Sequence, residues 1–281
     1  MPAMIVDPSK CTKCGVCLKA CPSGIVSFGD TGLPEMDVRL ASNCIECGHC
    51  ALFCPASANS LSFLSAEKMV PANTLEMPSE RAALNLIKTR RSILRFKDES
   101  VPKDVIAEIF EAVRMAPTAS NSQPVRWIVA HDSSLTKEIV NLILCWMREE
   151  IFKNPTSPVA LLGAHMIAKA REGEDGLLRG APHAAIAVVP KSYRWPEDGS
   201  IALTYFELAA HGMGVGACWG GFLTMAVRKF APLREFLGIG EDEHICGAQM
   251  FGYPALEPVR QFPTRKAPDI TWLASKAAGN E

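Results

Sequence analysis

The chain has 281 residues, of which 48% are hydrophobic and 21% charged, and its formal net charge is −1. This length and composition are typical of about two globular domains with sizeable cores. The near-zero charge, with Lys and Arg scattered along the chain, argues against binding to nucleic acid or to an anionic membrane surface. The longest apolar runs fall short of the roughly 18 residues that a membrane span needs.

Two copies of one cysteine pattern open the chain, each reading Cys-x2-Cys-x2-Cys-x3-Cys-Pro. The cysteines are Cys11, Cys14, Cys17 and Cys21 in the first copy and Cys44, Cys47, Cys50 and Cys54 in the second. Each cysteine of the second copy lies 33 residues after its counterpart. Eight thiolates at this spacing are what two cubane 4Fe-4S clusters need, so the pattern predicts a protein that passes electrons one at a time.

Two other interpretations of the cysteines fit less well. Structural zinc sites use separated pairs of Cys-x2-Cys, and three thiolates at i, i+3 and i+6 are crowded around one tetrahedral ion. A disulfide framework needs an oxidising compartment, but the chain starts MPAMIVDPSK, without a basic segment followed by an apolar one. We therefore expect a cytoplasmic protein, in which Gly15 and Gly48 let backbone N–H groups approach the cluster sulfurs.

The cysteine repeat resembles the bacterial two-cluster ferredoxin family over roughly the first 65 residues. In that family the last cysteine of each run binds the other cluster. The resemblance implies two ligand sets, one of Cys11, Cys14, Cys17 and Cys54 and the other of Cys44, Cys47, Cys50 and Cys21.

The texture of the sequence changes after the second cysteine run. Residues 60–64 predict the closing strand of a small cluster domain at 1–65, and residues 66–80, with two prolines and no clear period, predict a linker. The rest of the chain, 81–281, is expected to form a second domain.

Helices and strands alternate in this second domain. The apolar periods predict helices from Arg81, from Pro102 to Pro117, and over 201–213, and buried strands over 127–130, 184–189 and 245–253. The regular rhythm of a doubly wound sheet is missing, and no G-x-G-x-x-G follows a strand, which argues against a Rossmann domain. The sequence predicts an α+β layered domain with a mixed sheet flanked by helices.

Four segments in this domain resemble, in order, the motifs of the FMN-dependent nitroreductase family. They are 89–96 (TRRSILRF), 116–124 (APTASNSQP), 212–222 (GMGVGACWGGF) and 252–254 (GYP). The resemblance covers residues 81–275 and implies an FMN-dependent oxidoreductase that works as a homodimer, with FMN at the subunit interface. It also implies that 142–180 is a variable cover over the flavin that sets substrate choice, although ordinary surface helices would look the same.

The resemblance places the FMN phosphate beside Arg90, Arg91 and Ser92, with Arg265 from the far end of the domain. A phosphate dianion suits this set because guanidinium groups form charge-assisted, bidentate hydrogen bonds with it. Without the other motifs, an Arg-Arg-Ser before a helical stripe would more often be a solvated face.

The remaining candidate residues would contact the flavin rings. Asn121 and Gln123 carry amides that suit the pyrimidine edge, although a polar turn is an equal interpretation for Gln123. Gly220 and Gly221 let a backbone N–H approach the central ring nitrogen. Trp219 is either a flavin neighbour or an ordinary core residue.

The sequence departs from the family pattern in two places. The basic residue expected two positions after Ser92 is Leu94, with Arg95 following, so the charge near the flavin's pyrimidine end is in question. The tryptophan expected after Gln-Pro is Val125, followed by Arg126, which is a candidate for the missing charge.

These features predict an oxidoreductase in which a ferredoxin-type donor charges two clusters, the clusters reduce FMN, and FMN reduces a small electrophile such as a nitro compound. No side chain is expected to act as a nucleophile. One alternative is a flavoprotein that oxidises NAD(P)H and sends electrons outward through the clusters. Another is a redox sensor or electron-storage module without turnover.

Overall fold

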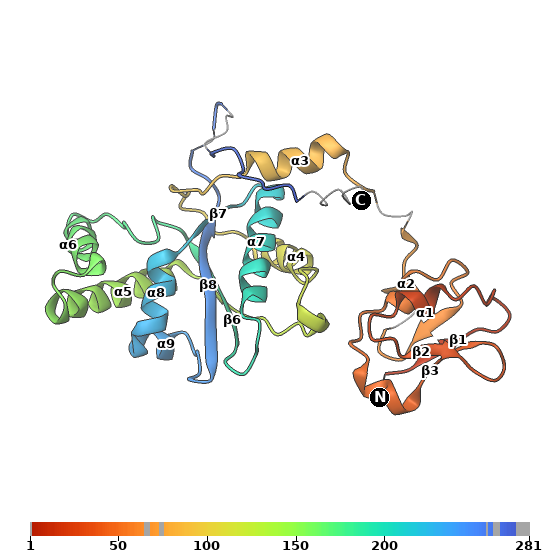
Figure 1. Cartoon of the computed structure of the whole chain (residues 1–281). Helices are drawn as coiled ribbons and strands as arrows, with labels where there is room; N and C mark the ends of the chain where they lie inside the picture. The colour runs from red at the N-terminus through yellow and green to blue at the C-terminus, as the bar shows by residue number, and fades with distance from the viewer. Residues whose placement is uncertain (1, 65–67, 73–75, 257, 261–264, 274–281) are drawn as a thin grey trace, which may run out of the picture.

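The computed structural model describes residues 2–64, 68–72, 76–256, 258–260 and 265–273. Residues 2–64 form a small part, which lies to one side of a larger α+β part (Figure 1). Most of the expected linker at 66–80 is described, but residues 66, 67 and 73–75 lie outside the described residues. Among the described residues, no helix combines the length and apolar character needed to cross a bilayer.

The described residues of the small part form two short antiparallel strand pairs and three short helical segments. Its elements are β1 (Met4–Val6), α1 (Val16–Ala20), β2 (Val26–Phe28), β3 (Pro34–Met36), the 3-10 helix η1 (Val38–Asn43), α2 (His49–Leu52) and β4 (Asn59–Leu61). The first strand pairs with the last, with Met4 opposite Leu61, and β2 pairs with β3. The predicted closing strand at 60–64 is therefore β4, which begins and ends earlier than expected.

The backbone repeats the symmetry of the sequence. Gly15 and Gly48 have φ values of 71° and 75° and immediately precede α1 and α2. Lys13 and Glu46, at equivalent places in the two cysteine runs, also have positive φ values, 57° and 51°. Left-handed backbone at matching positions shows that both cysteine loops turn in the same way, and glycine makes that conformation inexpensive.

The larger part is a four-stranded sheet between two layers of helices. Its elements are α3 (Glu80–Thr89), α4 (Lys103–Val113), the 3-10 helix η4 (Ala119–Asn121), β5 (Arg126–Ala130), α5 (Ser133–Lys153), α6 (Pro158–Arg171), β6 (His183–Pro190), α7 (Glu197–Gly212), β7 (Gly216–Trp219), α8 (Gly221–Lys229), α9 (Ala231–Phe236) and β8 (Glu243–Gly252). The strand order is β5-β6-β8-β7. Helices α4 and α7 cover one face, and α5, α8 and α9 cover the other (Figure 1).

Strand β6 shows why the sheet is buried on both faces. It is a continuous apolar run, and successive side chains of a strand point to opposite sides. Ile186 and Val188 join the cluster with α5, α8 and α9, whereas Ala185 joins the cluster with α4 and α7, and Ala187 and Val189 pack with Leu203 of α7. A helix layer on each face therefore follows from this one strand.

The predicted α+β class is confirmed, but the sheet differs from the expected mixed one. All three described pairings, β5 with β6, β6 with β8 and β7 with β8, are antiparallel. Strand direction was not fixed by the sequence because long helical connections separate these strands and can return the chain either way. The glycine-rich segment also contains a strand, β7, which the sequence did not predict because its apolar run is too short.

Candidate functional site

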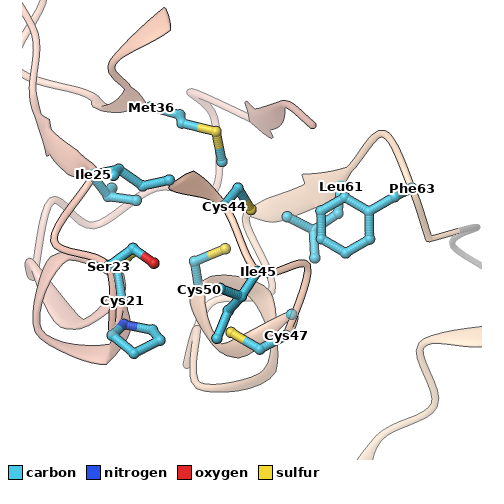
Figure 2. A pocket seen from close by; sticks show the side chains of 13 residues that line it. Cys21, Ser23, Ile25, Met36, Cys44, Ile45, Cys47, Cys50, Leu61 and Phe63 are labelled. Carbon is cyan, nitrogen blue, oxygen red and sulfur yellow. The ribbon is translucent and has the colours of Figure 1, made fainter. Parts of the chain in front are cut away.

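The eight cysteines of the repeat line two separate cavities in the small part. Figure 2 shows the first cavity, where thiols meet apolar side chains such as Met36 and Leu61. The first is lined by Cys21, Cys44, Cys47 and Cys50, and the second by Cys11, Cys14, Cys17 and Cys54. Each cavity thus takes three thiols from one run and the fourth from the other run, in the grouping that the ferredoxin resemblance implies.

Each cavity is lined by four cysteines, the number of thiolates that one cubane cluster needs. Among the described residues, no group of three or more His, Cys, Asp or Glu side chains is arranged to hold one metal ion. The thiols instead surround cavities. Backbone and amide groups approach them, since the N–H of Ala58 donates to Sγ of Cys54 at 3.3 Å and Asn59 Nδ2 donates to the Cys50 carbonyl at 2.6 Å.

Burial affects the protonation of the cavity thiols. It raises the pKa of the Cys50 thiol to about 11 and also raises the pKa of Cys17. By contrast, the pKa of the exposed Cys14 thiol is lowered, chiefly by the backbone N–H of Val16. Because thiolates are the form that binds metal, a positively charged iron centre is the partner that would make the buried anions stable.

A third cavity, of about 260 Å³, lies in the larger part where α3 ends and α7 ends. Its lining includes Arg90, Arg91 and Lys97, together with Glu207. The Arg90 guanidinium donates from Nη1 to Oε1 of Glu207 at 2.6 Å, and this carboxylate is only 7% exposed. His211 completes the wall, and burial is the main cause that lowers its pKa. The cavity is therefore cationic, with one buried carboxylate that fixes Arg90.

Ser92 lies beside this cavity rather than in its lining. Its hydroxyl contacts the Cys218 thiol, whose pKa is raised mainly by burial. Arg265 is exposed and is not among the residues that line the cavity. The structure thus brings Arg90 and Arg91 together, with Ser92 close in sequence, but it does not bring Arg265 to them.

The loop before β5 carries Asn121 and Gln123 and has an unusual backbone. Ser120, Asn121 and Gln123 all have positive φ values, of 51°, 54° and 47°. Such values are uncommon for residues other than glycine and persist only where the surroundings hold them.

A buried acid near the start of α7 anchors this loop by hydrogen bonds. Asp198 is 6% exposed, and its carboxylate accepts hydrogen bonds from the backbone N–H of Ala119 at 2.9 Å and from the Tyr193 hydroxyl. The Ser122 hydroxyl contacts the same Tyr193 oxygen at 2.8 Å. Burial, followed by this hydrogen bond to the carboxylate, raises the pKa of Tyr193.

The two halves of the predicted flavin site lie toward opposite ends of α7. Glu207 holds Arg90 and Asp198 holds the Asn121 loop, and nine residues of helix separate the two acids by about 13 Å along the axis. Gln123 lines another cavity, of about 380 Å³, with Phe110 and Trp127. Within one chain, Arg90 and Gln123 therefore do not share a cavity.

The glycine segment gives a mixed result. The backbone N–H of Gly220 already donates to the Ala248 carbonyl at 2.8 Å, so it is not available to a flavin ring. Gly221 is the exposed first residue of α8, where a helix leaves its N–H groups without intrahelical partners. Trp219 is 41% exposed at the end of β7, so it is not a fully buried core residue.

Arg126 does not supply the charge missing at Leu94. Its guanidinium forms a bidentate pair with Glu243, at 2.7 and 2.6 Å, and also donates to the Gly238 carbonyl. The pair raises the pKa of Arg126 and lowers that of Glu243. Arg95 is exposed and donates to the Leu94 carbonyl at 3.2 Å.

Sequence reasoning missed Glu207, Asp198 and Tyr193. The first two are acids in an otherwise largely apolar helix, and a buried acid almost always has a partner. The need of a buried acid for a partner could have marked Glu207 and Asp198 as candidates, but it does not identify the residue that each one binds.

Comparison with known proteins gives the class of both parts. Residues 5–58 match the family described as a 4Fe-4S dicluster domain, and residues 87–253 match the nitroreductase family. The second match spans more than half of the chain. The chain therefore belongs to the nitroreductase family, carries a 4Fe-4S dicluster domain ahead of it, and is an oxidoreductase of the nitroreductase type. This confirms the fusion predicted from the sequence.

Individual relatives agree with this assignment. The chain is 30% identical over 185 residues to a Methanothermobacter thermautotrophicus protein provisionally named NADH dehydrogenase/NAD(P)H nitroreductase, covering 64% of this chain and 81% of that protein. It is 29% identical over 199 residues to a Thermus thermophilus NADH dehydrogenase, covering 64% and 88%.

Solved structures show the same fold. A nitroreductase with bound FMN from Bacteroides fragilis matches with a TM-score of 0.56 and 22% identity, covering 68% of this chain and 98% of that one. A nitroreductase with bound FMN from Desulfitobacterium hafniense matches with a TM-score of 0.55 and 20% identity, covering 71% and 100%.

Proposed function

We propose that this chain holds FMN and two 4Fe-4S clusters and uses them to reduce a small electrophilic acceptor, such as a nitro compound. The observation that carries this proposal is the presence of two cavities lined by four thiols each on one chain with a nitroreductase fold. When bound, the clusters supply one-electron transfer, and the flavin converts it to the two-electron chemistry that such an acceptor needs.

The residues of the Arg90 cavity fit the phosphate end of FMN. Arg90 and Arg91 both line a cavity of about 260 Å³, and their positive charge suits a dianion. One Nη1 hydrogen bond to Glu207 orients Arg90 and leaves its other N–H groups to bind phosphate. The N–H of Gly221, at the start of α8, would bind the flavin rings.

A homodimer is part of this proposal, because Arg90 and Gln123 line different cavities of one chain. A second copy would bring its Asn121 loop to the Arg90 cavity. The test is co-expression of Arg90→Ala and Asn121→Ala chains with different affinity tags. If the site is shared, each variant alone loses FMN, whereas the purified mixed dimer regains one FMN. A site within one chain predicts no recovery in the mixed dimer.

The direct test of the cofactors is anaerobic purification with iron, acid-labile sulfide and flavin counted per chain. We expect about eight iron atoms and one FMN per chain. A chain that contains zinc and no iron would refute the electron-transfer proposal. We propose that the protein works in the reducing cytoplasm, because its eight cluster cysteines must stay as free thiols until iron binds.

The relatives' names support a second candidate direction, in which NAD(P)H reduces the flavin and electrons leave through the clusters. Anaerobic stopped-flow mixing with NADH or NADPH separates the two. Rapid bleaching of the flavin favours this direction, whereas no bleaching by either nucleotide, with rapid bleaching by a reduced ferredoxin, favours the first.

A further inference from the structure

A hydrogen bond joins the loop of residues 118–123, which carries Asn121, to one of the two cysteine runs. Nδ2 of Asn121 donates to the backbone carbonyl of Ile45, with the two atoms 3.0 Å apart and partly buried. Ile45 lies between Cys44 and Cys47 and lines the cavity formed by those thiols together with Cys50 and Cys21. Among the described residues, this hydrogen bond therefore joins the larger part to the wall of one particular cavity.

The contacting loop is held in place rather than loosely exposed. Asn121 itself is in the left-handed region, between Ser120 and Gln123, which share that conformation. Asp198 fixes the start of the loop through the Ala119 N–H. Because a strained and anchored loop presents the Asn121 amide in one direction, its contact with Ile45 is a defined docking point.

The repeat supplies an internal comparison for this contact. Thr12 and Lys13 occupy the same places in the first cysteine run that Ile45 and Glu46 occupy in the second. The Lys13 ammonium donates to the Thr31 carbonyl at 3.3 Å, within the small part. This hydrogen bond of the first run, whose thiols line the other cavity, thus stays within the small part.

We infer that the cavity of Cys21, Cys44, Cys47 and Cys50 is the inner cluster site, the one that exchanges electrons with the flavin. The cavity of Cys11, Cys14, Cys17 and Cys54 is then the outer cluster site, which accepts electrons from an external one-electron donor, a protein of the ferredoxin class. This order rests on the proposed function.

The electron balance follows from that order. Each encounter oxidises the donor by one electron and reduces the outer cluster site by one electron. The outer cluster site then passes this electron to the inner cluster site. Two such electrons and one proton from water reduce one oxidised FMN to its anionic two-electron form. No bond to a side chain forms or breaks, and Asn121 can still contact the flavin through its amide oxygen and second N–H.

Hydrogen exchange tests the docking without measuring activity. In the anaerobic protein with its clusters in place and FMN supplied in excess, so that the variant is also loaded, we compare the natural chain with Asn121→Ala, following the amides of residues 44–48 and, as the matched control, those of 11–15. We expect exchange at 44–48 to become about fivefold faster, the effect of losing one hydrogen bond, with no change at 11–15. No change at 44–48, or an equal change in both runs, would overturn the inference.

A pair of matched variants tests the order of transfer. Glu46 and Lys13 are both exposed and both have positive φ, so Glu46→Trp and Lys13→Trp add the same bulk at equivalent places. After mixing with a reduced two-cluster ferredoxin, stopped-flow spectra separate bleaching of the clusters from bleaching of the flavin. We expect Glu46→Trp to slow the flavin step about tenfold, through misplacement, and Lys13→Trp to leave that step unchanged.

The outcomes separate the two proposals. If Lys13→Trp slows the flavin step as much as Glu46→Trp does, or more, the assigned order is wrong. If the natural holoenzyme bleaches its clusters but never its flavin, the proposed function fails, whatever the exchange experiment shows.

Discussion

His183 makes the stability of the larger part depend on pH. Its side chain is fully buried, its Nε2 accepts the backbone N–H of Val101 at 2.8 Å, and its ring stacks on His131 with 4.7 Å between centroids. Burial lowers the pKa of His183 to about 4, from an ordinary value of 6.5. A neutral imidazole is therefore part of the folded structure, because protonation would remove the acceptor from Val101.

The sign of the effect follows from proton counting. Between the two pKa values the unfolded chain binds more protons at this position than the folded chain does, so the free energy of unfolding falls as the pH is lowered. The contribution of His183 is fully present above about pH 6.5 and is lost by about pH 4. With these values, lowering the pH from 7 to 5 removes about 2 kcal/mol of stability.

Urea unfolding at several pH values measures this loss. All five tryptophans lie in residues 127–272, so their fluorescence reports on the larger part alone. The control is His183→Gln, because a glutamine amide oxygen can accept from Val101 and does not titrate. We expect the stability of the variant to fall by about 2 kcal/mol less than that of the natural chain between pH 7 and pH 5. Parallel loss in both proteins would refute the role of His183.

Three further predictions concern α7 and the residues that it holds. Gly199→Ala places a Cβ in steric conflict with Sγ of Cys246, so we expect urea unfolding to show a loss of about 1–3 kcal/mol. Gly212→Ala meets its nearest neighbour at 3.5 Å and should show no loss from overpacking. Arg90→Ala removes a charge-assisted phosphate ligand and should weaken FMN binding about 10- to 100-fold in flavin fluorescence titrations; an unchanged affinity would show that the phosphate binds elsewhere. Asp198→Asn weakens the anchor of the 118–123 loop, and hydrogen exchange in that loop should become roughly tenfold faster, while β6 serves as the unchanged reference.

The features that the sequence predicts correctly are local ones. The cysteine runs set their own loop geometry, because glycine at 15 and 48 permits the left-handed turn that starts each short helix. Strand β6 and helix α7 were also predictable, since an unbroken apolar run between prolines and a mostly apolar helical segment both require burial.

The features that the sequence does not predict are non-local. Glu207 and Asp198 hold Arg90 and the Asn121 loop at separate places along α7, and the sequence does not identify either acid as their partner. The pairing of Arg126 with Glu243 depends on the register of β5, β6 and β8, which side-chain periodicity does not determine. Strand directions were unpredictable because long helical connections can return the chain either way.

The weakness of the Asn121–Ile45 contact is consistent with its proposed role. One hydrogen bond contributes about 1 kcal/mol, which would not hold two separate proteins together. On a single chain the contact is intramolecular, and a short tether gives an effective concentration in the mM range. The tether thus keeps the cysteine run of Ile45 close to the loop of residues 118–123, where the hydrogen bond from Asn121 orients it. Fusion of the two parts therefore allows a small contact to serve as a docking point, where two separate proteins would need a larger interface.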